Sequence, residues 1–215
     1  MTAVLGDVDL FFVLDIFILL LIGMGPKVAL VPFLDLTADM DADTRSDVAK
    51  QMVRTAVSVA LFLVIFGSIL MELFHFSENA LYIAGGIIFF LLAIRMIRSS
   101  GEDRDHEEKA SDRDGMEIAF YPLAVPYLLN PVGITLLIIY SAAFESLVLL
   151  AILAGVVLLV GAFDLLLFTN LDTVASHLDE SRMSVTETLF GVILAAVAIE
   201  LILQGLVGLG VIGHL

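Results

Sequence analysis

The sequence predicts an all-α membrane protein with six transmembrane helices, arranged as two inverted three-helix repeats. Three observations support this prediction: the apolar composition, the length of the apolar stretches, and a constant spacing between matching motifs. Of the 215 residues, 60% are hydrophobic and only 16% are charged. Soluble domains are about half apolar and about a quarter charged, so a water-facing fold is a poor fit.

Apolar stretches of spanning length recur along the chain. A transmembrane helix needs about 20 mainly apolar residues. Six segments reach or approach this length: 10–34, 55–71, 80–97, 118–143, 147–168 and 189–212. The first has no basic flank and no small-residue cleavage site, so we interpret it as a retained span and not as a removed signal peptide.

The basic residues predict the orientation, because loops rich in Lys and Arg remain in the cytoplasm. Nine of the ten follow the first, third and fifth spans. They are Arg45, Lys50, Arg54, Arg95, Arg98, Arg104, Lys109, Arg113 and Arg182. The remaining loops and both ends of the chain have none. We therefore expect a multi-pass protein of the cell membrane with both termini outside the cytoplasm.

Matching motifs recur at a spacing of 105 residues. Gly25-Pro26 and Asn130-Pro131 are separated by this distance, and so are Gly86 and Gly191. Each half contains three spans, an odd number, so the second half enters the membrane from the opposite side. This inverted repeat is common among secondary transporters. We predict a first repeat at 1–98, an acidic cytoplasmic loop at 99–116 and a second repeat at 117–215.

The first span of each repeat is interrupted by proline. Proline lacks an N–H group and clashes with the preceding turn, so Gly25-Pro26 and Asn130-Pro131 predict broken helices. Freed backbone groups cannot face lipid, and a new helix N-terminus favours an anion. The breaks either shape the packing alone or converge on a central binding site, and their symmetric placement favours the site. Its candidate residues are Gly25, Pro26, Lys27, Asn130, Pro131, Gly133 and Thr135.

Charged side chains within the spans require a partner or a role, because each costs at least about 2.5–3.5 kcal/mol in the bilayer. Lys27 either reaches towards the cytoplasmic headgroups or pairs with Asp164, which the span boundaries place at a similar depth. Glu200 either binds a coupling ion or forms a hydrogen bond within the bundle, and Asp15 is expected to line an outer vestibule. Asp164, Glu200 and Asp15 are the candidates for ion coupling.

Other patterns narrow the function. The small residues Gly85, Gly86 and Gly191 predict close helix packing and not ligand contact. No metalloprotease, nucleophile-elbow or phosphate-loop motif is present, and there is no Cys, so we expect neither an enzyme nor a cofactor or metal site. The formal net charge of −15 argues against nucleic-acid binding. Acidic, Lys-poor loops serve either to bind cations or to keep a halophile's protein soluble, and we favour the second reading.

The stretches GPKVALVPFLDLTADMD, IAGGIIFFLLAIRMI and IAFYPLAVPYLLNPVGITLLIIYS resemble the MarC family of inner-membrane proteins, over essentially the whole chain. The resemblance, together with the acidic loops, suggests a haloarchaeal member. It implies six helices and transport of small neutral amino acids. Two features depart from the family pattern: Asn-Pro and Gly-Pro are exchanged between the breaks, and Lys27 replaces a small or apolar residue.

From these observations we expect a secondary transporter of a small solute such as a neutral amino acid, coupled to Na⁺ or H⁺. We expect the protein to contact membrane lipid, and the sequence leaves open whether it forms a homo-oligomer. The alternatives are an exporter of small metabolites or drugs, and a membrane scaffold that transports nothing.

Overall fold

A computed structural model describes residues 10–99, 115–144, 146–171 and 180–213 of the chain. These residues form helices and no strand, which confirms the all-α class. They group into two compact units, each described by itself below. The first unit covers Met1–Leu73 and Ala110–Asn170, and the second covers Phe74–Lys109 and Leu171–Leu215.

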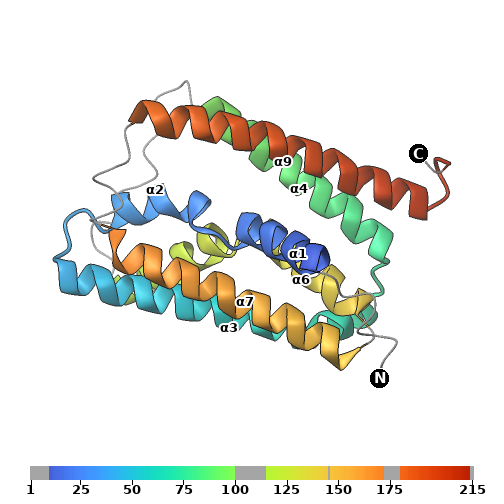
Figure 1. The fold of residues 1–215 in the computed structure, drawn as a ribbon, viewed down its shortest axis with the longest axis horizontal. Helices are drawn as coiled ribbons and strands as arrows, with labels where there is room; N and C mark the ends of the chain where they lie inside the picture. Colours follow the sequence, from blue (N-terminus) through green and yellow to red (C-terminus); the bar gives the residue numbers. More distant parts are fainter. Residues whose placement is uncertain (1–9, 100–114, 145, 172–179, 214–215) are drawn as a thin grey trace. The chain divides into compact units, whose positions relative to one another are not determined.

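The first unit contains the two broken spans and the helix that follows each (Figure 1). Its elements are α1 (Leu10–Gly23), α2 (Pro26–Leu36), α3 (Ala42–Phe74), α5 (Gly115–Ile118), the irregular helical segment η1 (Ala119–Leu128), α6 (Pro131–Ala143) and α7 (Leu147–Thr169). Helices α2 and α6 begin at prolines 105 residues apart, and α3 and α7 begin at Ala42 and Leu147, also 105 residues apart. These bounds are consistent with the predicted repeat.

The second unit is a pair of long helices, α4 (Glu78–Ser99) and α9 (Glu180–Gly208), which run side by side in opposite directions (Figure 1). Both units therefore draw elements from both predicted repeats. The predicted halves are not the compact units of the structure, and the division at 99–116 stays a prediction. Most of that loop lies outside the described residues.

Glycines let α4 and α9 approach closely. A Cβ atom added at Gly86 would lie 2.6 Å from the carbonyl oxygen of Ala198, and one added at Gly191 would lie 3.3 Å from that of Ala93. Shifting Gly86 and Ala93 by 105 residues gives Gly191 and Ala198, so the repeat exchanges the two contacts. The predicted packing role of Gly86 and Gly191 is thus consistent with the structure, and Gly85 is also buried.

The close approach at Gly86 predicts that a larger residue at this position destabilises the protein. Gly86→Ala should destabilise the protein by about 1–3 kcal/mol, because the added methyl group meets backbone that cannot rotate away. Gly155→Ala is the matched control, since no atom lies within 4 Å of a Cβ added there, and alanine favours a helix. In detergent, the unfolding temperature should fall in Gly86→Ala and rise in Gly155→Ala. Equal shifts would contradict a tight α4–α9 contact.

Several helices are long and apolar enough to cross a membrane. Among the described residues these are Phe11–Leu30, Ala42–Phe74 and Leu147–Thr169, and a fourth span forms if Gly115–Leu128 and Pro131–Ala143 are counted together across their 67° bend. In α4 and α9 the described apolar portions are shorter, Glu78–Leu91 and Leu194–Gly208. All six expected stretches are mainly helical where described, interrupted at the two breaks and ending at Gly208 in the last stretch, but the count of six spans stays a prediction.

Large apolar side chains cover the outer surface of the first unit. Ile65 on α3 is 63% exposed and Leu166 on α7 is 67% exposed. In water such patches favour aggregation or partner binding, whereas in a bilayer they contact lipid tails. This surface is the one expected of a transmembrane bundle.

The start of α3 is stabilised by an acidic cap. The Asp41 carbonyl accepts the Arg45 N–H at 2.9 Å, and a hydrogen bond from the Thr44 side chain lowers the pKa of the exposed Asp41 carboxyl below its ordinary value of 3.8. A carboxyl with a lowered pKa in the folded state contributes stability above its unfolded pKa and loses it as the pH falls through the folded value. Capping of α3 is therefore expected to fail only in acid.

This linkage can be measured with Asp41→Ala. At about pH 7 the variant should unfold at a lower temperature than the wild type, and the difference should shrink as the pH falls through the lowered folded-state pKa, because the wild-type carboxyl then becomes protonated. Asp39→Ala in the same loop is the control for the loss of one negative charge. A gap that persists in acid would contradict the capping role.

Candidate functional site

The first break separates α1 from α2. Gly25 precedes α2 in an extended conformation (φ −106°, ψ 169°), and Pro26 is the first helical residue, where its missing N–H costs nothing. A Cβ atom at Gly25 would collide with the carbonyl oxygen of Leu21. Gly25 is therefore required for the chain to turn here, and it provides no side chain to cap α2.

The second break separates η1 from α6. Asn130 is extended (φ −80°, ψ 166°), and its Oδ1 accepts hydrogen bonds from the N–H groups of Val132 at 3.0 Å and Gly133 at 3.2 Å. Upstream, Tyr121 and Val125 leave the helical region. Each precedes a proline, and that position disfavours the α conformation. Both predicted breaks are confirmed at their predicted residues.

Asn130 also joins the two breaks. Its Nδ2 donates to the carbonyl oxygen of Ile22 at 2.9 Å, and its backbone N–H donates to that of Gly23 at 3.0 Å. These are two carbonyls at the end of α1, which lack partners within their own helix. Asn130 is 1% exposed, so a single buried side chain caps the start of α6 and binds the end of α1.

Two glycines make this junction sterically possible. A Cβ atom at Gly23 would lie 2.5 Å from the Cα of Gly133, and one at Gly133 would collide with the carbonyl oxygen of Gly23. The backbones of α1 and α6 are thus in direct contact. The two breaks therefore lie in contact with each other as expected, and the binding site at this place stays a prediction.

This geometry changes the role expected for the second break. The Oδ1 of Asn130 occupies the first free N–H groups of α6, so the start of α6 is not open to an anion. Thr135 is also engaged, since its Oγ1 donates to the carbonyl oxygen of Pro131 at 2.9 Å. Asn130 and Thr135 make structural contacts here. The start of α2, where Gly25 stands in place of Asn130, has no such side-chain cap.

Asp164 on α7 is fully enclosed in the first unit, with 0% exposure. One turn before it, a Cβ atom added at Gly161 would collide with Val57 of α3 and lie 4.0 Å from the Met24 side chain. One turn after it, the Phe168 ring packs on Phe33 of α2, with centroids 5.0 Å apart. Neither carboxylate oxygen has a hydrogen-bond partner in the described part of the chain.

The predicted ion pair between Lys27 and Asp164 is not formed among the described residues. Lys27 is half-buried and its Nζ is enclosed, as the prediction required. However, both oxygens of Asp164 lack a hydrogen-bond partner. Similar depth on neighbouring helices does not ensure that two side chains meet, because each helix also fixes the direction in which its side chain points.

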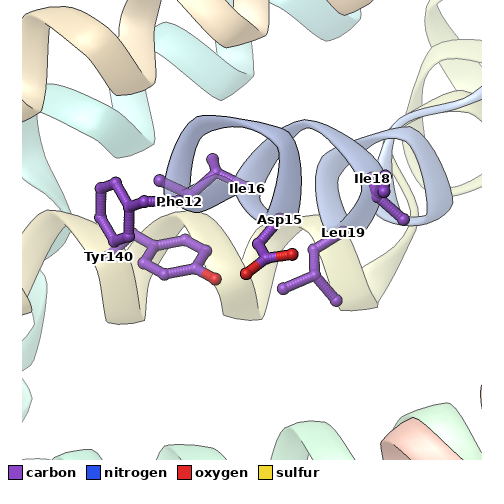
Figure 2. Close-up of a pocket in the computed structure, with 6 residues that line it drawn as sticks. All are labelled: Phe12, Asp15, Ile16, Ile18, Leu19 and Tyr140. Carbon is purple, nitrogen blue, oxygen red and sulfur yellow. The ribbon is translucent and has the colours of Figure 1, made fainter. Parts of the chain in front are cut away.

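The other two acidic candidates lie apart from the junction. Glu200 is exposed on α9 of the second unit, and so is Gln204. Asp15 is exposed on α1 and lines a shallow hollow of about 360 Å³ (Figure 2). Its carboxylate points towards the Tyr140 hydroxyl, beside Phe12, Ile16, Ile18 and Leu19. Asp15 thus contributes to a surface hollow and does not contact the breaks.

Two contacts in this unit were missed by sequence reasoning. Gly23 supports the junction, and its place two residues before Gly25 was the available signal. Ser141 on α6 has no comparable signal. Its Oγ donates to the Val64 carbonyl at 2.9 Å and accepts the Ser68 N–H at 3.1 Å, bridging two groups one turn apart on α3.

Comparisons with known proteins place the chain in a family. Residues 10–209 match the pattern described as MarC family integral membrane protein. A UPF0056 membrane protein of Methanocaldococcus jannaschii is 30% identical over 193 residues, covering 86% of this chain and 91% of its own.

Bacterial relatives cover similar lengths. UPF0056 membrane protein YvbG of Bacillus subtilis is 27% identical over 92% of this chain and 95% of its own. YhcE of Escherichia coli is 26% identical over 88% and 89%. These names describe membrane proteins and give no substrate or catalytic activity, and no solved structure matches. The chain belongs to the MarC family of integral membrane proteins.

Proposed function

We propose that this protein is a secondary transporter of a small solute across the cell membrane, coupled to Na⁺ or H⁺. The observation that carries the proposal is the direct junction of two broken spans, in the same compact unit as a buried carboxylate that makes no hydrogen bond within the described residues. Broken helices that meet within a bundle are a recurring basis of solute sites in transporters. A buried carboxylate without a partner is costly and suggests an ion pathway.

The two breaks are chemically unequal, and this asymmetry suggests where the solute binds. The start of α6 is capped by Asn130, whereas the start of α2 has only Gly25 and is followed directly by Lys27. A helix N-terminus and an ammonium group both favour a carboxylate. We therefore assign the carboxylate of a small neutral amino acid to Gly25, Pro26 and Lys27. Asp164, Glu200 and Asp15 remain the candidates for coupling.

The orientation proposed from the basic residues completes this picture. The loop that precedes α3 would face the cytoplasm, and the loop that precedes α7 would face outward. Both termini would then lie outside. Transport would require the bundle to open towards each side in turn around the junction.

Flux into liposomes tests the proposal. Purified protein should accumulate labelled glycine, alanine or serine when a Na⁺ or H⁺ gradient is imposed, and empty liposomes should not. Accumulation of other metabolites alone would favour the exporter. If no solute of a broad panel moves while the protein co-purifies with a stable partner, the scaffold is the better account.

Lys27 has a specific expected effect in this assay. Lys27→Met should raise the KM for uptake by about 10–100-fold, since a hydrogen bond to a charged group contributes about 1.5–3 kcal/mol. Lys50→Met is the matched control, because Lys50 is exposed and pairs with Asp47 at 2.9 Å, away from the breaks. Unchanged KM in Lys27→Met would remove Lys27 from the solute site.

A further inference from the structure

The buried carboxylate of Asp164 has an environment that restricts what it can bind. One turn before it, a Cβ atom added at Gly161 would meet the side chains of Val57 and Met24, and one turn after it the ring of Phe168 packs on Phe33. All of these are apolar. An isolated charge in such surroundings is strongly disfavoured, so the carboxylate must be neutralised by a bound proton or a bound cation.

The charged groups on the helices that pack against α7 do not supply this neutralisation in the described structure. Asp15 on α1, Asp35 on α2 and Arg54 on α3 are exposed, so they do not face a fully enclosed group. Arg45 near the start of α3 is half-buried, and its guanidinium donates to the carbonyl oxygen of Thr37 at 3.3 Å. Lys27 on α2 is half-buried, but Asp164 makes no hydrogen bond to it or to any other described residue.

A proton fits this site better than a metal ion. Hard cations in proteins are held by several oxygen ligands at once. The neighbouring positions Gly161 and Phe168 face methyl, thioether and aromatic groups, and no group of three or more His, Cys, Asp or Glu residues gathers in the described part of the chain. A proton needs only the carboxylate itself.

We propose that Asp164 is the proton-binding site of this protein, which makes H⁺ and not Na⁺ the coupling ion. This inference rests on the proposed transport function and deepens it. When the bundle is closed around Asp164, the side chain is a neutral carboxylic acid. When the bundle opens to water on one side, the proton exchanges with that side, and re-protonation from the other side completes the cycle.

Infrared spectroscopy of the protein in lipid vesicles tests the site without requiring transport. At about pH 7 an exposed aspartate is ionised, so a carboxylic-acid C=O band of aspartic acid reports a buried, protonated group. We expect this band in the wild type and in Asp15→Asn, and its loss in Asp164→Asn. Added Na⁺ at constant pH should leave the band unchanged.

A second measurement covers the case in which Asp164→Asn does not fold. Labelling the wild type with ¹³C-aspartate should shift the same band to lower frequency. A wild type without this band at neutral pH would overturn the proposal, and so would a band that Na⁺ abolishes. Because the readout needs no flux, a protonated Asp164 in a protein that moves no solute would reject only the transport function.

Transport measurements then separate coupling from binding. Asp164→Asn should lose accumulation driven by a proton gradient but retain exchange of labelled solute across the membrane, because exchange needs no net proton movement. Retained proton-driven accumulation in a folded Asp164→Asn protein would overturn the assignment, whatever the solute.

Discussion

Replacing Asn130 by leucine should destabilise the protein by about 2–5 kcal/mol. The variant loses the cap of α6, a change that costs about 0.5–2 kcal/mol, and leaves the buried carbonyl of Ile22 without its donor, which costs about 1–3 kcal/mol more. Both losses fall on one residue, because the Asn130 side chain serves both breaks. Thermal unfolding of the purified protein in detergent measures the effect.

Two further variants separate the two roles of Asn130. Asn130→Asp keeps an oxygen acceptor for the N–H groups of α6 but removes the donor to Ile22, so it should show an intermediate loss. Ser146→Ala removes a single capping bond at the start of α7, to Val148 at 3.2 Å, and should cost only about 1 kcal/mol. If Asn130→Leu is no worse than Ser146→Ala, Asn130 does not join the breaks.

Gly133→Val should separate the two broken helices and abolish solute flux. Even a methyl group at this position collides with the carbonyl oxygen of Gly23 and lies 2.7 Å from its carbonyl carbon. These are backbone atoms, so the strain can be relieved only if α1 and α6 move apart, and that movement breaks the hydrogen bonds of Asn130. Gly155→Val on the exposed side of α7 is the control and should leave flux intact.

A double-mutant cycle isolates the contact. Gly23→Ala and Gly133→Ala are each expected to destabilise the protein, and the double variant should lose less than the sum, because both changes disrupt the same contact. Fully additive losses would show that the two glycines act through separate neighbours and would contradict the junction.

Sequence reasoning recovered the helices and the breaks because both arise from local chemistry. Long apolar runs dictate spanning helices, and Pro26 and Pro131 interrupt two of them wherever they lie in the fold. The spacing of 105 residues also predicted that the breaks would be related. Their convergence could be anticipated for the same reason, since freed backbone groups need partners away from lipid.

The direction of individual side chains could not be predicted. Asn130 was expected to contact solute, but its amide is directed into the junction and is used by the backbone of both breaks. Lys27 and Asp164 were expected to meet because their span boundaries suggest a similar depth, yet they form no ion pair among the described residues. Hydropathy and spacing determine the depth of a residue, whereas its direction depends on helix rotation, which only the packed structure reveals.

The asymmetry between the breaks is the feature that sequence and structure share. Asn130 before Pro131 caps the start of α6, whereas Gly25 before Pro26 leaves the start of α2 without a side-chain cap. In the second half of the repeat Asn130 stabilises the junction, whereas in the first half the corresponding position is Gly25, and Lys27 lies in the first turn of α2. We infer that the repeat determines how the broken helices are arranged, and that the residues in which the two copies differ provide the groups that bind solute.

The inverted repeat is the central claim, and side-specific labelling of single cysteines tests it most directly. The chain has no native cysteine, so each introduced thiol is unique. Asp41 and Ser146 are equivalent positions, 105 residues apart, that precede α3 and α7. In intact cells, a membrane-impermeant maleimide should label Ser146→Cys but reach Asp41→Cys only after the membrane is permeabilised. Labelling of both positions from the same side would contradict the inverted arrangement.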